Sequence, residues 1–200
     1  MVSALAPNCA EHYRRLLAGE SGLVEQPVED GLPVKTWAPA WRDRYGSRIE
    51  NRMLRKLLQP SAAMAVLAAG QALTDAGLRN DAERLERTGL FIGSVSFELP
   101  QGLYVPALDA SLNTAGQFDF KYFAQRGMAA LDPLLIVKGL PNAGLCGISI
   151  EFGVLGPNLN IANDSMGGLQ AVAAAMAAIV RGDAEIAVAG AMTLYFSRST

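Results

Sequence analysis

The chain has 200 residues, half of them apolar, and a formal net charge of −2. This length suits one domain, or one half of a larger one, with a sizeable buried core. Arginines gather between residues 42 and 55, but Asp43 and Glu50 interrupt them. Because no basic stripe is present, nucleic acid is not expected as a partner, and the arginines fit a solvated helix face.

A short helix is predicted near the N-terminus. Asn8 suits the N-cap of a helix that ends at Gly19. Residues 20–46 hold several prolines and glycines and show no steady period. This segment is interpreted as irregular covering structure that could include short strands.

Two further helices are predicted before residue 77. Ser47 is expected to begin the first of them, with Ile49 and Met53 on its apolar face. Pro60 ends that helix and suits the first turn of the next one, 61–75. This second helix is apolar nearly all round, which indicates a position inside the protein.

The rest of the chain alternates helices with short apolar strands. Residues 95–131 are rich in loops and aromatic side chains; they are interpreted as a loop that packs its own aromatics, with a dedicated binding role as the alternative. Asp164 or Ser165 is expected to cap the helix that runs to Arg181. The remaining predicted elements are strands at 88–94, around Ile161 and at 185–191, and helices at 132–140 and 142–152. This alternation predicts an α/β fold with a mostly parallel sheet covered by helices on both faces.

The cysteines and the histidine indicate no metal site. Cys9 and Cys146 lie far apart without metal-type spacing, and His12 is the single histidine of the chain. The cysteine usage favours a reducing cytosol, so a cytoplasmic protein is expected. Cys146 is predicted to be a small core residue of an apolar helix, and His12 a solvated side chain.

No targeting or membrane segment is expected either. The first seven residues lack a basic region and a long apolar run, unlike a signal peptide. The longest apolar helical runs, 62–69 and 171–180, are shorter than the ~20 residues that cross a bilayer.

Ser165 is the main candidate for chemistry. It stands where a predicted strand meets a helix, so its side chain meets free backbone N–H groups and the positive end of the helix dipole. A serine hydrolase fits poorly, because Asn163 occupies a position that needs glycine and no histidine follows. A helix cap is the plainer interpretation, since an N-cap serine contributes ~1 kcal/mol.

No phosphate-binding loop competes with this candidate. Neither a G-x-G-x-x-G nor a Walker-type sequence follows a predicted strand. Gly153 and Gly156 are explained by the geometry of the turn that they flank.

Several motifs occur in a fixed order and together cover nearly the whole chain. In the second half they are Asn142, Ile148-Ser149-Ile150, Phe152-Gly153-Val154-Leu155-Gly156-Pro157-Asn158, Asn163-Asp164-Ser165-Met166-Gly167-Gly168, Gly182-Asp183-Ala184-Glu185 and Ala189-Gly190-Ala191. Upstream they are Leu16 to Leu23, Ala72 to Leu78 and Arg87 to Ser94. This set resembles the β-ketoacyl synthases, the condensing enzymes of fatty-acid and polyketide synthesis.

The resemblance implies a thiolase-like α/β fold, with residues 1–200 as a β-ketoacyl synthase N-terminal-like domain, the N-terminal half of that fold. It implies acyl groups delivered by a phosphopantetheinyl acyl carrier protein, with no other cofactor. It also implies a homo- or hetero-dimer with a ketosynthase. In the family a cysteine takes the acyl chain, and two histidines of the second half assist decarboxylation and carbon–carbon bond formation.

The sequence departs from this family pattern at the candidate site. Ser165 stands at the position of the nucleophilic cysteine, and a serine hydroxyl needs an adjacent base that an activated thiol does not. Asp164 replaces a small residue and places a negative charge beside any anion that forms. The chain ends at Thr200, about where the family's first half ends, before both histidines.

Three functional expectations follow. The chain is a β-ketoacyl synthase-like protein in which Ser165 could at most take an acyl group as an oxyester. Alternatively, it is a non-catalytic partner subunit of a ketosynthase, similar to a chain length factor, or a truncated inactive fragment. A half-fold is expected to expose a broad apolar surface, which a partner would cover.

Overall fold

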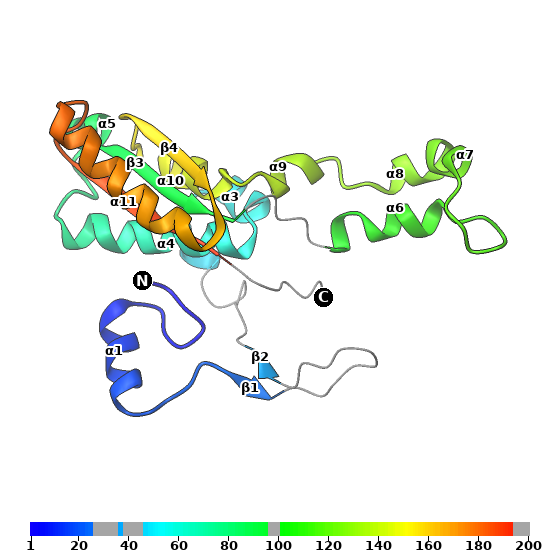
Figure 1. Ribbon diagram of the computed structural model, residues 1–200, viewed down its shortest axis with the longest axis horizontal. Helices are drawn as coiled ribbons and strands as arrows, with labels where there is room; N and C mark the ends of the chain where they lie inside the picture. Colours follow the sequence, from blue (N-terminus) through cyan, green and yellow to red (C-terminus); the bar gives the residue numbers. More distant parts are fainter. Residues whose placement is uncertain (26–35, 38–45, 96–100, 194–200) are drawn as a thin grey trace.

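The computed structural model describes residues 1–25, 36–37, 46–95 and 101–193 (Figure 1). Its centre is a parallel sheet of three strands in the order β4-β3-β5. The strands are β3 (Gly89–Ser94), β4 (Asn158–Ala162) and β5 (Ala187–Ala191). The predicted parallel sheet and its three strands are confirmed.

Helices cover both faces of this sheet, as the sequence pattern predicts. The helices are α4 (Pro60–Asp75), α10 (Ala143–Phe152) and α11 (Asp164–Arg181). Leu90 and Ile92 of β3 pack in one cluster with α4 and α10, whereas Phe91 packs with α11 on the opposite face. All six residues of β3 are buried, which is typical of a central strand in a parallel sheet.

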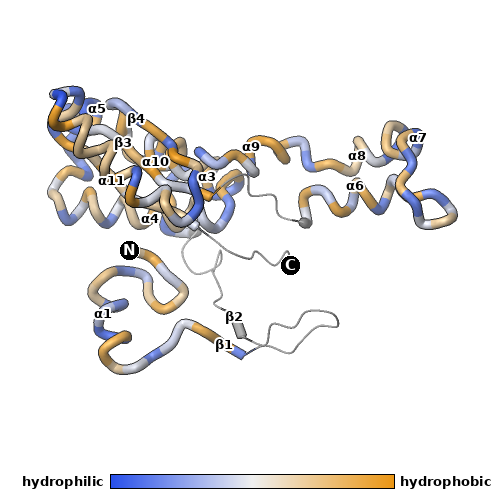
Figure 2. Tube along the Cα trace, in the orientation of Figure 1, coloured by the Kyte–Doolittle hydropathy of each residue, from blue (hydrophilic) through white to orange (hydrophobic). Residues whose placement is uncertain are grey.

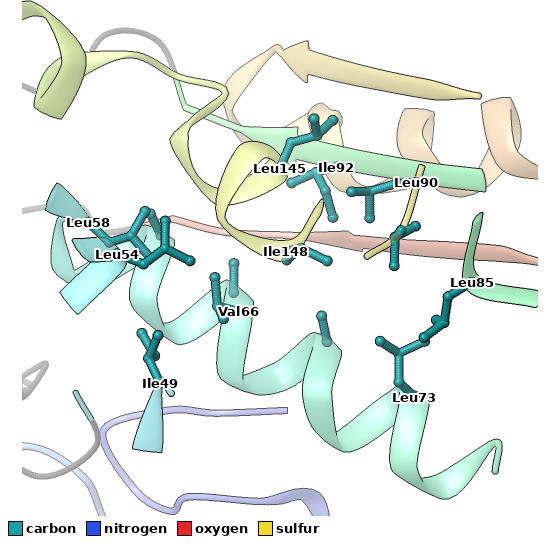
Figure 3. Packing of buried hydrophobic residues seen from close by; sticks show 14 of the residues in the cluster. Ile49, Leu54, Leu58, Val66, Leu73, Leu85, Leu90, Ile92, Leu145 and Ile148 are labelled. Carbon is teal, nitrogen blue, oxygen red and sulfur yellow. The ribbon is translucent and has the colours of Figure 1, made fainter. Parts of the chain in front are cut away.

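The larger core cluster joins α4 and α10 to the sheet (Figure 3). Val66 and Leu73 of α4 and Ile148 of α10 are almost completely buried in it. Burying such a side chain contributes about 1.5–3 kcal/mol each. Pro60 is the first residue of α4, as predicted, and Gly77 follows its end with a φ of 67°.

The N-terminal part confirms one prediction and corrects another. Helix α1 (Cys9–Leu17) is capped by Asn8, whose Oδ1 accepts from the backbone N–H of Glu11 at 2.8 Å. The helix predicted from Ser47 instead begins at Arg52, because Asn51 caps it there and accepts from two backbone N–H groups. Met53 is exposed rather than part of an apolar face. The elements of this part are β1 (Val24–Glu25) paired with β2 (Thr36–Trp37), η1 (Gly46–Arg48), α3 (Arg52–Leu57) and α5 (Ala82–Arg87).

Residues 101–131 form an arm that extends away from the sheet (Figure 1). The prediction of a loop-rich segment is wrong in part, because short helices account for much of the arm. Its aromatics do contact one another, with the ring of Phe118 5.1 Å from that of Phe120 and 5.9 Å from that of Phe123. Phe97 belongs to the predicted segment but lies outside the described residues. The helices are η2 (Gln101–Leu103), α6 (Val105–Ala110), α7 (Phe120–Tyr122), a π-helix (Phe123–Gly127), α8 (Met128–Ala130) and, beyond the arm, α9 (Leu135–Gly139).

Figure 2 shows how the hydropathy of the residues is distributed over the sheet and the arm. Hydrophobic colour runs along β3, and hydrophilic colour marks the turn at the far end of the arm. Across the described ranges, none of the helices combines the length and the apolar character needed to cross a membrane.

The backbones of β3 and α11 touch directly. A Cβ atom at Gly93 would lie 2.3 Å from the carbonyl carbon of Gly167 and 2.4 Å from the nitrogen of Gly168. A Cβ atom at Gly167 would in turn lie 2.9 Å from the carbonyl oxygen of Ile161 in β4. Because no side chain fits between them, these glycines set the distance from the sheet to the start of α11.

Substituting Gly93 by alanine should therefore destabilise the fold. The new methyl group would meet backbone atoms that cannot rotate away, and overpacking of this kind costs about 1–3 kcal/mol, occasionally more. Gly190→Ala in the neighbouring strand β5 is the matched control, because no described heavy atom other than those of its chain neighbours lies within 4 Å of its Cβ position. Urea unfolding of both variants would measure the difference, and equal stability of the two would contradict the close contact.

Candidate functional site

Ser165 lies in the first turn of α11, one residue after the helix begins. The N-cap is Asn163, whose carbonyl oxygen accepts from the N–H groups of Met166 and Gly167, both at 3.0 Å. The prediction that Asp164 or Ser165 caps the helix is therefore wrong. The first helical hydrogen bonds start from Asn163, which makes Asp164 and Ser165 the first two helical residues.

The start of α11 has unpaired donors. The side chain of Asn163 does not cap the helix, because its Nδ2 donates to Gln170 Oε1 at 2.9 Å. Among the residues that the structure describes, the backbone N–H groups of Asp164 and Ser165 have no hydrogen-bond acceptor. Such orphan N–H groups are where a helix start meets an anion or a polarised carbonyl oxygen.

Ser165 itself is exposed, and no base is hydrogen-bonded to its hydroxyl among the described residues. Its hydroxyl makes no hydrogen bond to any described residue. His12, the single histidine, is on α1 and partly buried, with its Nδ1 atom 2.8 Å from Ser3 Oγ. A serine nucleophile requires a base within hydrogen-bond reach, and none of the described residues supplies one.

Asp164 has a strained backbone. Its φ of 36° is in the left-handed region, and it is the one residue other than glycine with positive φ in the described ranges. A conformation of this kind costs about 1–3 kcal/mol and persists only where the surrounding structure imposes it. Here α11 is held against Gly93, and β4 enters the turn from the sheet, so little freedom remains for the residue between them.

Two polar side chains support the turn from the opposite face of the sheet. Asn160 Nδ2 donates to Ser94 Oγ at 3.0 Å, and the N–H of Asn163 donates to the carbonyl of Ser94 at 3.2 Å. Ser94 thus joins the ends of β3 and β4, whereas Asn160 Oδ1 is buried without a partner among the described atoms. The sequence-based prediction gave neither residue a role at the site. Asn160 could have been noticed, because it is a polar amide within a strand that is expected to be apolar.

The clearest shifts in pKa occur away from this turn. Hydrogen bonds from Arg14 and then Arg15 lower the pKa of Glu11, on the surface of α1, to about 2. The pKa of Asp132 is lowered by a hydrogen bond from the Lys138 side chain and by the backbone N–H of Leu134. A lowered pKa makes each carboxylate a weaker base, and each is hydrogen-bonded to its own cationic partners and not to Ser165.

Other predicted features are placed as follows. Cys146 is exposed on α10, so its prediction as a core residue is wrong: α10 is apolar on several sides and only one of them faces the sheet.

The two glycines of the turn before β4 have different reasons. Gly153 has a φ of 71°, which confirms its role in the turn. Gly156 is required by space instead, because a Cβ atom there would lie 2.5 Å from the carbonyl oxygen of Thr88. Across the described ranges, no group of three or more histidine, cysteine, aspartate and glutamate side chains could hold a metal ion.

One cavity of about 420 Å³ lies between α4 and β5. Its lining is mostly apolar and includes Ala68 and Ala72 of α4 and Val188 of β5. Val188 pairs in register with Leu90, whose side chain faces α4 and α10. The cavity is therefore on the opposite side of the sheet from α11 and Ser165.

Comparison with known proteins gives one consistent family. The family model described as "Beta-ketoacyl synthase, N-terminal domain" matches residues 3–200. The 3-oxoacyl-[acyl-carrier-protein] synthase 2 of Vibrio harveyi is 28% identical over 195 residues, which is 95% of this chain and 43% of that protein. The protein of the same name from Vibrio cholerae is 27% identical with the same coverage. The chain thus spans less than half the length of these curated relatives.

Solved structures share the fold at low identity. A β-ketoacyl synthase from Burkholderia phymatum STM815 superposes with a TM-score of 0.63 at 20% identity, covering 92% of this chain and 42% of the other. The ishigamide ketosynthase/chain length factor gives 0.66 at 21% identity, with 95% and 49% covered. A type II polyketide synthase acyl-carrier protein in complex with its ketosynthase bound to the hexaketide gives 0.65 at 16%, with 95% and 47% covered. At these identities they show that this chain has the ketosynthase, thiolase-like fold.

The strain at Asp164 predicts an order of stability among variants. Glycine adopts a φ of 36° without a clash, whereas alanine does not, so Asp164→Gly should be more stable than Asp164→Ala by about 1 kcal/mol. In an ordinary helix the order is reversed, because glycine is the poorer helix former. Thermal unfolding of both variants decides between these two orders of stability. A more stable alanine variant would refute the left-handed conformation of Asp164.

Proposed function

The chain belongs to the β-ketoacyl synthase family, and from this premise we propose that it acts in fatty-acid or polyketide biosynthesis with acyl transfer at Ser165 impaired or lost. The observation that carries the proposal is the environment of the Ser165 hydroxyl: no described base is hydrogen-bonded to it, and the preceding residue, Asp164, places a negative charge beside any anion that would form there. A cytoplasmic location is part of the proposal.

The residual chemistry of the turn is limited. The free N–H groups of Asp164 and Ser165 are donors of the kind that stabilise an oxyanion. A serine hydroxyl still has to lose its proton before or during attack on a thioester, and no described side chain accepts that proton. An oxyester on Ser165 is therefore expected to form too slowly to detect, and no condensation is expected from the described residues.

Acyl groups would arrive on the phosphopantetheine arm of an acyl carrier protein. The Vibrio relatives are synthases named for this carrier, and one of the similar solved structures is a ketosynthase in complex with it, which supports the proposal. No other cofactor is part of the proposal.

Incubation with an acyl-loaded acyl carrier protein tests the role of Ser165. The experiment uses a chain with Cys9 and Cys146 replaced by serine, because both thiols are exposed and could exchange with the thioester. Intact-mass analysis should show no acyl adduct beyond that of the same chain with Ser165→Ala. An adduct that maps to Ser165 and is absent from the alanine variant would show that the site transfers acyl groups.

A second candidate function is that of a non-catalytic ketosynthase partner, comparable to a chain length factor. In the described sheet, β4 pairs with β3 on one side and has no strand on the other. The carbonyl of Pro157 and the N–H of Asn163 both bond to β3, so by alternation residues 158, 160 and 162 direct their backbone groups away from it. A free edge of this kind is a template for a strand of another chain.

Exposed apolar side chains occur on β4 and on the helices that precede and follow it. They lie on three elements that follow one another in the chain: Ile150 on α10, Leu159 on β4, and Val172 and Met176 on α11. Large exposed apolar side chains close to an unpaired edge favour contact with another subunit. The structure of a ketosynthase/chain length factor among the similar folds supports a ketosynthase as that subunit.

Leu159→Lys should weaken binding of a full-length ketosynthase at least tenfold. An ammonium group at the edge of β4 would be desolvated in the interface, and 1.4 kcal/mol corresponds to a factor of ten in affinity. Met53→Lys introduces the same charge at an exposed methionine of α3 and serves as the control. Each variant would carry an affinity tag, and the amount of each ketosynthase of a panel that is recovered with it would be measured. Equal recovery with both variants would remove β4 from the interface.

An inactive fragment is the remaining alternative. It predicts neither an adduct on Ser165 nor recovery of any ketosynthase. Recovery of a ketosynthase would exclude it in favour of the partner role, and an adduct on Ser165 would exclude it in favour of acyl transfer.

A further inference from the structure

The charge at the start of α11 comes from a single side chain. The strands β3, β4 and β5, which pack against α11, contain no ionisable residue. On α11 itself the ionisable residues are Asp164 and Arg181, at opposite ends of the helix. At 1.5 Å per residue they are about 25 Å apart, beyond the screening length at physiological salt.

A described cation beside the ends of β3 and β5 is already paired. Lys138 of α9 lines a small cavity together with Val95 and Met192, which follow β3 and β5. Its ammonium group donates to Asp132, so the two side chains form an ion pair with little net charge. Asp164 has no such partner within the described part of the chain.

Asp164 is placed to act on position 165. It is the first helical residue, Ser165 is the second, and the side chains of both are exposed. The positive end of a helix dipole is what stabilises a thiolate or an oxyanion at such a position. A carboxylate at the same place offsets that potential, and a like charge within a few ångströms disfavours a second anion.

We propose that Asp164 lowers the reactivity of a nucleophile at position 165, independently of the serine that stands there. Its carboxylate occupies the positive end of α11, where a nucleophile and an oxyanion would otherwise be stabilised. A thiol introduced at position 165 is then less ionised at neutral pH than it would be without the carboxylate of Asp164. This inference rests on the proposed function, in which the turn has the position but not the activity of an acyl-transfer site.

The reactivity of an introduced thiol tests the proposal without any carrier protein or partner. The background chain is C9S/C146S/S165C, and D164N removes the charge while keeping a side chain that tolerates a positive φ. D164N should lower the pKa of the introduced thiol by about half a unit to one unit. The rate of alkylation by iodoacetamide at pH 7 then rises roughly three- to tenfold, as measured in a pH–rate profile.

D183N is the matched control in the same background. It makes the same chemical change just beyond the other end of α11, where Asp183 accepts from Arg181 Nε at 2.8 Å, and should leave the alkylation rate unchanged. Added salt should reduce the effect of D164N, because exposed charges are screened. If D164N changes the thiol pKa no more than D183N does, the proposal is overturned, provided that circular dichroism shows both variants folded. An acyl adduct on Ser165 would instead count against the proposed function, and it is measured on a different chain.

Discussion

The direct contact between Gly93 of β3 and the Gly167–Gly168 backbone of α11 is the constraint on which the site depends. It brings a long helix against the sheet without side chains between them. Because β4 ends five residues before Gly167, the turn that joins β4 to α11 has to reverse within a short distance. Asp164 takes up this geometry with a left-handed backbone, and the first N–H groups of the helix are left unpaired.

Polar groups on the far side of the sheet complete this arrangement. Ser94 receives hydrogen bonds from the Asn160 side chain and from the Asn163 backbone, so the ends of β3 and β4 are held together directly beneath the turn. An unpaired buried oxygen on Asn160 is a cost that an apolar residue would avoid. The turn is therefore well supported structurally, although the chemical groups that would make Ser165 reactive are not among the described residues.

The sequence predicts the sheet and the long helices well, because their apolar runs are bounded by glycine and proline. It also identifies the turn at Ser165. It misplaces the start of α3, where two polar residues compete as caps and Asn51 prevails over Ser47. Cys146 is misassigned because α10 is apolar on several sides, and only tertiary packing decides which side is buried. The sequence does not predict the left-handed backbone of Asp164: aspartate tolerates a positive φ better than most residues, but only the tertiary packing of the turn calls for one here.

Geometry and reactivity are separable in this fold. The elements that present Ser165, β4 and α11, also carry exposed apolar side chains, including Leu159, Val172 and Met176. Covering such a side chain contributes about 1.5–3 kcal/mol, whereas the identity of the residue at position 165 contributes little to packing because it is exposed. A requirement to bind a partner through β4 and α11 would thus preserve the glycine contact and the strained turn even where the nucleophile is lost. A well-formed turn at Ser165 is for this reason weak evidence for catalysis, and the charge of Asp164 is the more informative feature.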